Sequence, residues 1–229
     1  MTLVCVRQPG YLPYMGFFKK IESSDIFVLF DDAQYAIRAW DNRNKIRNKT
    51  ESFWITVPVI KPFKKLLNQV EINGDDWKLK HIELIKSNYS NTKFFKDYWN
   101  EFESILFQQQ RNLSDLNIAL IEHIVQILDI DTKIIRSSEL NVSGKSSEKL
   151  LNICKKLEAR SYLSGTMGTE YLDETIFEKN GIRVVHEKFL HPVYEQSHNS
   201  FIPNLSIIDL IFNEGTNAKN ILKNAKNIL

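Results

Sequence analysis

The 229-residue sequence contains few cysteines, and the two it has lie far apart. Cys5 and Cys154 form no CxxC pair, which excludes a disulfide framework and a cysteine zinc site. Such sparse cysteine usage is typical of a reducing cytosol. Cys5 falls inside an apolar run, and we expect it to be a small buried residue.

An excess of one charge is also missing. The chain has 30 basic and 28 acidic residues, which gives a formal net charge of +2. Dedicated nucleic-acid-binding proteins usually concentrate basic residues on one face, so we expect no stable DNA binding. The stretch "RAWDNRNKIRNK" is a local basic cluster, so this expectation concerns the chain as a whole rather than every surface.

Long hydrophobic runs are absent as well. The first residues, "MTLVCV", have no basic region and are too short for the apolar part of a signal peptide. No apolar run reaches the length that a bilayer requires. We therefore expect a cytoplasmic protein without a membrane span.

The apolar periodicity that is present predicts an α/β fold. Residues 2–6 and 25–30 form short apolar runs typical of buried strands, and residues 14–23 have helical spacing. Strand, helix and strand in close succession form the repeating unit of a parallel sheet. The same alternation returns between residues 132 and 189. We expect a mostly parallel, Rossmann-like sheet with a helical insertion in the middle of the chain.

The insertion is predicted from three amphipathic segments. Apolar residues recur every three or four positions in residues 76–90, 92–108 and 113–130. We expect one α/β domain over residues 1–229, with residues 75–130 as a helical subdomain inserted in it.

Ligands of open α/β sheets bind beyond the carboxyl ends of the strands, and an unusual loop follows the first predicted strand. In "RQPGYLPY" two prolines stiffen the chain and a glycine permits close approach of the backbone. The loop is either a rigid turn or a preorganised ligand wall in which Gln8 and Tyr11 face the substrate.

Acidic residues follow the second predicted strand in "DDAQY". Asp31 and Asp32 suit a general base, a metal ligand or a hydroxyl clamp, and Gln34 suits a substrate contact. A structural cap is the alternative interpretation. Adjacent residues of an extended chain point in opposite directions, so we expect one of the two aspartates to face the site.

A polar segment without clear periodicity extends over residues 33–50, which predicts a long functional loop before a third strand at residues 52–60. Within it, Arg43 and Lys45 are candidates for binding phosphate, and Asn44 is a candidate for an added hydrogen bond. A solvated basic loop is the alternative. A fourth strand is expected near residues 68–73.

The C-terminal part supplies the remaining candidates. "SGTMG" could present backbone N–H groups to an oxyanion, with Ser164, Gly165 and Tyr171 as substrate contacts. His191 is the candidate general base, because imidazole transfers protons near neutral pH. A single histidine is more often structural, and the histidine spacing matches no zinc motif. Three neighbours of His191 are further substrate-binding candidates: His186, Tyr194 and Gln196.

Together these stretches resemble the WbqC-like family of bacterial proteins. The resemblance rests on "QPGYLPYMGFFKKI", "DIFVLFDDAQY", "WDNRNKI", "WITVPV", "YLSG", "HPVYEQ" and "FIPNLSIIDLIFNEG", which follow one another along nearly the whole chain. It implies a place among genes for O-antigen and other surface-polysaccharide synthesis, and an acyl- or aminoacyl-transferase role suggested for some members. The family supplies no site residues that transfer securely to this sequence.

The resemblance therefore implies a transferase that acylates the amine of a nucleotide-linked or lipid-linked amino sugar. Such a reaction needs a base, oxyanion donors and cations for the diphosphate. The donor would be an acyl-CoA or an aminoacyl-tRNA, and a homodimer is left open. A metal-dependent nucleotidyl- or glycosyl-transferase of the same pathway is one alternative, and a non-catalytic binding protein for its enzymes is another.

Overall fold

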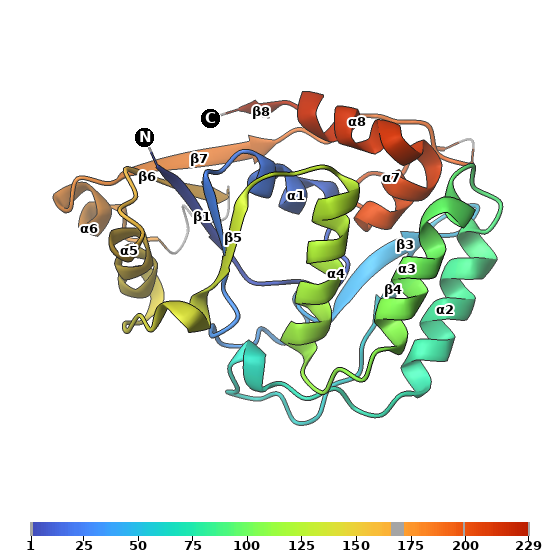
Figure 1. The fold of residues 1–229 in the computed structure, drawn as a ribbon, viewed down its shortest axis with the longest axis horizontal. Coiled ribbons are helices and arrows are strands. Elements are labelled where there is room, and N and C mark those ends of the chain that lie inside the picture. The colour runs from blue at the N-terminus through green and yellow to red at the C-terminus, as the bar shows by residue number, and fades with distance from the viewer. Residues whose placement is uncertain (1, 166–171, 199, 229) are drawn as a thin grey trace.

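Five parallel strands form the centre of the computed structural model, which describes residues 2–165, 172–198 and 200–228 (Figure 1). Their order across the sheet is β5-β2-β1-β6-β7, and a short antiparallel strand, β8, pairs with β7 at one edge. The predicted α/β fold with a mostly parallel, Rossmann-like sheet is confirmed. The strands are β1 (Leu3–Arg7), β2 (Ile26–Leu29), β5 (Lys133–Arg136), β6 (Ser161–Gly165), β7 (Arg183–Phe189) and β8 (Asn227–Ile228).

The central strands are apolar because helices cover both faces of the sheet. Side chains alternate along β1, so Cys5 joins one hydrophobic cluster while Val4 and Val6 join the other. The first cluster includes α1 (Met15–Glu22), α4 (Leu113–Ile127), α7 (Ile207–Glu214) and α8 (Ala218–Asn224). The second includes α5 (Ser146–Lys156) and α6 (Glu174–Lys179). Burial raises the pKa of Cys5 to about 12, so its thiol stays protonated.

The order in which strands are added to the sheet reverses between β1 and β6, although the two strands are parallel. From β1 the chain proceeds through β2 to β5 on one side, and it later returns to β6 and β7 on the other side. The carboxyl ends of β1 and β6 therefore flank a topological switch point, where open α/β sheets bind their ligands.

The helical middle of the chain packs beside the sheet. Besides α4 it contains α2 (Asp76–Tyr89) and α3 (Phe95–Phe107), so the three predicted helices are confirmed. Phe95 stacks on Trp99 and contacts Phe212 of α7, which joins the middle of the chain to its C-terminal part. Among the residues described, no helix is both long and apolar enough to cross a bilayer.

The prediction of a continuous loop over residues 33–50 is wrong in one part. β3 (Arg43–Arg47) pairs antiparallel with β4 (Ser52–Thr56), and the two form a separate two-stranded sheet. One of the buried positions of β3 holds Asn44 instead of an apolar residue, which hides the alternation of a strand. The strand expected near residues 68–73 is replaced by a short 3-10 helix, η1 (Leu67–Gln69), and isolated bridges.

Candidate functional site

Charged side chains from two strands and one helix meet at the switch point, beside a glycine of a third strand. The register pairs Cys5 with Leu163 and Gly165 with Glu187, so Arg7 is level with Gly165 at the carboxyl ends of β1, β6 and β7. A Cβ atom added to Gly165 would lie 3.7 Å from Arg7 Nη1 and 3.9 Å from Lys20 Nζ. The missing side chain of Gly165 leaves room beside these two cations.

This group, which we call the switch-point cluster, consists of Arg7, Tyr14, Lys20, Gly165 and Glu187. Lys20 of α1 forms a buried ion pair with Glu187 Oε2. Glu187 Oε1 is buried without a hydrogen-bond partner. Within the described part of the chain, the Arg7 guanidinium likewise forms no hydrogen bond or ion pair. A buried carboxylate oxygen without a hydrogen-bond partner is costly, so the Oε1 atom of Glu187 near the half-buried Arg7 guanidinium points to a ligand.

Tyr14 completes the cluster at the start of α1. Its ring contacts the edge of Phe189, with 6.1 Å between ring centroids. Burial raises the pKa of Tyr14, while the nearby Arg7 lowers it and the nearby Glu187 raises it. The hydroxyl is therefore protonated near neutral pH and is available as a donor beside both charged groups.

Asp41 lies close to Arg7 from the side of the loop before β3. Its Oδ2 atom accepts a hydrogen bond from Ala36 N at 3.0 Å. Burial raises the pKa of Asp41 to about 6, although this hydrogen bond and the nearby Arg7 both lower it. A carboxyl group with such a pKa is suited to proton transfer near neutral pH.

The opening loop is tied to the rest of the molecule rather than facing a ligand along its whole length. Gln8 Nε2 donates to the carbonyl oxygen of Gln34 at 2.9 Å, which places both predicted residues on the rim of the site. Tyr11 is fully buried, and its hydroxyl lies 2.9 Å from His81 Nδ1 in α2. Tyr11 therefore faces the helical middle of the chain and not the strand ends.

Asp31 and Asp32 are both occupied by contacts within the protein. Asp31 accepts hydrogen bonds from Ser137 Oγ, Ser138 N and Ser138 Oγ at 2.6–3.0 Å. Asp32 accepts from Ser137 Oγ at 2.5 Å and forms an ion pair with Lys149 Nζ at 2.6 Å. These contacts fasten the end of β2 to the segment after β5 and to α5. The arrangement is that of the structural cap.

The three predicted residues of β3 have different surroundings. Asn44 is buried and donates to the carbonyl oxygens of Tyr11 and Leu12, so it holds the opening loop against β3. Arg43 and Lys45 are half-buried, and their charged ends lie 4.2 and 5.2 Å from the ring centre of Trp54. Neither cation reaches the switch-point cluster through any described contact.

Of the candidates around β6 and β7, Gly165 belongs to the switch-point cluster and Tyr171 lies outside the described residues. Ser164 is buried beside Gly165 and pairs with His186 across the sheet. His186 Nε2 lies 2.8 Å from Oε1 of Glu174, the first residue of α6. The partner of His186 is therefore in α6, on the face of the sheet opposite to the one that Glu187 faces.

His191 lies beyond the end of β7 with one ring nitrogen occupied. His191 Nδ1 is 2.8 Å from the carbonyl oxygen of Pro192, which can only accept a hydrogen bond. Nδ1 must therefore carry the proton, and the lone pair is on Nε2. Burial lowers the pKa of His191, so the ring is neutral at pH 7. Its ring contacts Phe189, which contacts Tyr14 of the switch-point cluster.

Tyr194 and Gln196 belong to a buried hydrogen-bond network. Tyr194 Oη donates to Asp209 Oδ1 at 2.7 Å, and Gln196 Nε2 donates to the same oxygen at 2.9 Å. Arg47 Nη1 donates to Gln196 Oε1, and Tyr89 Oη donates to Asp209 Oδ2. Burial raises the pKa of Asp209 despite these donors. The network joins β3, α2 and α7, and both predicted residues serve as links in it.

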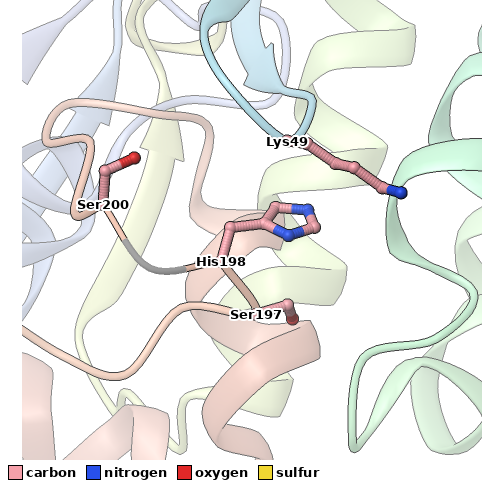
Figure 2. Close-up of a pocket in the computed structure, with 4 residues that line it drawn as sticks. All are labelled: Lys49, Ser197, His198 and Ser200. Carbon is pink, nitrogen blue, oxygen red and sulfur yellow. The ribbon is translucent and has the colours of Figure 1, made fainter.

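A separate hollow of about 390 Å³ opens near this network (Figure 2). In the view, Lys49 from the turn after β3 and His198 from the segment before α7 extend toward the same space. Burial and the nearby charges of Arg47 and Lys49 lower the pKa of His198. The described lining residues are Lys49, Ser197, His198 and Ser200. None of them belongs to the switch-point cluster.

Sequence reasoning did not identify most of the cluster. Arg7, Tyr14, Lys20 and Glu187 are absent from the predicted site, and so is Asp41. One of them carried a signal, because Arg7 ends the apolar run "LVCVR", whereas Glu187 lies among other polar residues in "RVVHEKF". A charged residue within an otherwise buried strand is rarely tolerated without a partner or a ligand.

Comparison with known proteins agrees with the resemblance noted in the sequence. The model of the WbqC-like protein family matches residues 8–221. The chain is also similar to the uncharacterized protein Rv1507c of Mycobacterium tuberculosis, with 34% identity over 227 residues. That match covers 97% of this chain and 98% of the mycobacterial protein. The family match therefore includes the helical middle and the segments from α1 to α7 that contribute to the site.

Proposed function

The chain belongs to the WbqC-like protein family, and on that premise we propose that it transfers an acyl or aminoacyl group to the amine of an amino sugar. The acceptor is nucleotide-linked and the pathway is bacterial surface-polysaccharide synthesis. We place the reaction in the cytoplasm, where the two free cysteines stay reduced. The pathway follows from the family resemblance, and the reaction is supported by the geometry at the strand ends.

The observation that carries the proposal is the unpartnered Oε1 atom of Glu187 near the Arg7 guanidinium in the switch-point cluster. Arg7 offers a planar fork of donors that fits a phosphate or carboxylate. Glu187 Oε1 offers an acceptor for an amine or hydroxyl. An amino sugar on a diphosphate carries both complementary groups in one molecule. Gly165 places no side chain beside Arg7 and Lys20.

His191 is the residue we assign to proton transfer. The amine nitrogen attacks the carbonyl carbon of the donor, a C–N bond forms, and the bond to the leaving thiol or alcohol breaks. The proton lost by the amine passes to Nε2 of His191, which is free because Nδ1 faces Pro192 O. The leaving thiolate or alkoxide then takes this proton from Nε2 and departs as the thiol or alcohol, which regenerates the neutral imidazole. The rings of Phe189 and Tyr14 connect His191 to the cluster, so the sugar would lie over them.

No structural observation favours the alternative of a nucleotidyl- or glycosyl-transferase. That alternative assigns a divalent metal to Asp31 or Asp32. Both carboxylates instead accept hydrogen bonds from Ser137, and further contacts come from Ser138 and Lys149. These contacts hold the end of β2 against the segment that follows β5.

The first experiment is thermal stabilisation by nucleotide-linked amino sugars, with the plain nucleotides and the non-aminated sugars as comparisons. A ligand at 100 times its Kd adds about 2.7 kcal/mol, which raises the melting temperature by several degrees in a chain of this size. We expect stabilisation by the amino sugars and its loss in Arg7→Gln. Arg183→Gln is the matched control, because Arg183 is exposed at the opposite end of β7.

Product analysis completes the test. Incubation with an acyl-CoA and the stabilising amino sugar is expected to give an N-acylated sugar, seen by mass spectrometry. Stabilisation by plain nucleotides alone, or equal stabilisation of Arg7→Gln, would contradict the assignment of the cluster. Binding without any acylated product from acyl-CoA or aminoacyl-tRNA would favour a non-catalytic binding protein.

A further inference from the structure

Basic charge is concentrated in one part of the chain. Residues 33–65 contain eight Lys or Arg and two Asp or Glu, whereas the whole protein has a net charge of only +2. Of the two acids, Asp41 is buried. In Figure 1 the blue and cyan coil of this segment runs along the lower edge of the molecule, below α4. Arg47 is buried as well, and Lys49 lines the separate hollow. The cations that this surface presents are therefore the exposed or half-buried ones: Arg38, Arg43, Lys45, Lys61, Lys64 and Lys65.

Two four-residue turns on this surface have the same backbone hydrogen bond and the same sign of φ in the third position. Ala39 N donates to Ala36 O, which places Ile37 and Arg38 at the tip of the first turn. Lys65 N donates to Pro62 O, which places Phe63 and Lys64 at the tip of the second. Each tip thus presents one apolar and one basic residue. The residue in the third position of each turn, Arg38 or Lys64, has a positive φ, which is uncommon for any residue except glycine.

The two tips are close to each other and project outward. Tyr35 N donates to Lys65 O, and Gln34 forms an antiparallel bridge with Leu66, so the bases of the two turns are paired. Ile37 is 58% exposed and Phe63 is 70% exposed. Large apolar side chains this exposed at adjacent turn tips do not contribute to the core, which points to an external partner.

Two tryptophans extend the apolar area. Trp40 and Trp54 are 50% and 39% exposed, and their ring centroids are 5.0 Å apart. Arg43 and Lys45 lie over the ring of Trp54. Tryptophan beside basic residues is typical of proteins that sit at the boundary between lipid headgroups and acyl chains. We call Ile37, Trp40, Trp54 and Phe63 the docking face.

We propose that the docking face binds the surface of an anionic phospholipid bilayer. Ile37 and Phe63 enter the boundary of the acyl chains, and the basic residues contact the lipid phosphates. Single-stranded RNA is the competing partner, since it also selects cations and aromatic rings. The structure favours the bilayer, because Ile37 cannot stack on a base and the Trp54 ring is already covered by Arg43.

The docking face is continuous with the rim of the site. Tyr11 N donates to Trp40 O, and Gly10 lies so close to Trp40 that an added Cβ would be 3.0 Å from its carbonyl oxygen. A bilayer that binds Trp40 would therefore lie next to the opening loop. This inference goes beyond the proposed reaction, and it holds whichever group the enzyme transfers.

The test is co-flotation of the full-length protein with vesicles of phosphatidylcholine, with or without phosphatidylglycerol. We expect binding to the vesicles that contain phosphatidylglycerol, and about tenfold weaker binding to pure phosphatidylcholine or at high salt. Ile37→Ser with Phe63→Ser is expected to reduce binding by about tenfold or more. Phe107→Ser is the matched control, since Phe107 is 52% exposed at the end of α3, outside the docking face.

Fluorescence gives a second measurement that does not depend on flotation. Vesicles containing phosphatidylglycerol are expected to shift the tryptophan emission to the blue, and Trp40→Phe is expected to remove most of the shift. The proposal is overturned if the wild-type protein does not float with either vesicle, or if the double serine variant floats as well as Phe107→Ser. It is also overturned if bulk transfer RNA binds tightly while vesicles do not.

Discussion

Tyr11 Oη lies 2.9 Å from Nδ1 of His81, and this buried contact joins the opening loop to the first helix of the helical middle. Burial lowers the pKa of His81 to about 4, so the imidazole is neutral at pH 7 and able to accept from the hydroxyl. Trp77 contacts both rings. The loop that was expected to face a substrate at Tyr11 is instead anchored there, so that its other residues have fixed positions.

Removing this hydroxyl should weaken the fold. In Tyr11→Phe, the buried Nδ1 of His81 loses its donor, which should cost about 1–3 kcal/mol in the free energy of unfolding. Urea unfolding followed by circular dichroism measures the loss. Tyr98→Phe is the matched control, because Tyr98 is a half-buried tyrosine of α3 whose hydroxyl has no described partner. Equal stability of the two variants would show that the contact contributes nothing.

A second prediction concerns Asp41, whose pKa is raised to about 6 from an ordinary value of 3.8. The folded protein holds this proton more tightly than the unfolded chain does, so Asp41 stabilises the fold below pH 4 and that stabilisation is lost as the pH rises through 6. Asp41→Asn has no such loss. Its free energy of unfolding relative to wild type should therefore increase between pH 4 and 7, by up to about 3 kcal/mol.

The comparison with wild type is needed because His81 has the opposite effect. Its lowered pKa means that the fold loses stability as the pH falls from about 6.5 to about 4. The difference between Asp41→Asn and wild type removes this contribution, provided that the two sites act independently. Asp129→Asn, at an exposed site, is the control for the substitution itself. A difference between Asp41→Asn and wild type that does not vary with pH would rule out the raised pKa.

A third prediction separates a structural role from a substrate role at Gln196. Gln196→Leu removes hydrogen bonds to Arg47, Asp209 and the Ile202 backbone, all within a buried network. Leaving the Arg47 charge without this partner should cost about 2–5 kcal/mol in the free energy of unfolding. Gln109→Leu, at an exposed position, is the control. A stable Gln196→Leu protein with weaker ligand binding would instead identify Gln196 as a substrate contact.

A fourth prediction follows from the tautomer of His191. The base must be neutral to accept a proton, and burial lowers its pKa below 6.5. The value of kcat/KM should therefore rise with pH and reach a plateau with a midpoint below pH 6.5. In His191→Asn, kcat/KM should fall at all pH values and should no longer rise with pH. In His198→Asn, both the value and its pH dependence should be unchanged. An unchanged pH profile in His191→Asn would exclude His191 as the base.

The sequence was sufficient for the fold because the strands and most helices depend on apolar periodicity, which is a local property. It failed at β3, where Asn44 occupies a buried position through hydrogen bonds to a distant loop. It failed at the site for a related reason. Arg7 and Glu187 are separated by nearly the whole chain, and only the strand order and register bring them level.

The candidate residues that were proposed from the sequence show the same limit. Asp31, Tyr194 and Gln196 were chosen because their side chains are chemically versatile. The same versatility makes them useful as buried connectors, and this is how the structure uses all three. Residue type alone does not distinguish these uses. What separates them is whether every polar atom already has a partner, as at Asp31, or lacks one, as at Glu187 Oε1.

The strand order also has a consequence for how the protein is made. β1 ends at Arg7 and leaves the ribosome long before its neighbour β6, which begins at Ser161. At a synthesis rate of about 5–20 residues per second, roughly 8–30 seconds pass before β6 emerges. During that interval β1 has one unpaired edge, which is a known hazard for aggregation. Biogenesis of this protein should therefore depend on chaperones that protect the edge of β1 until β6 has been translated.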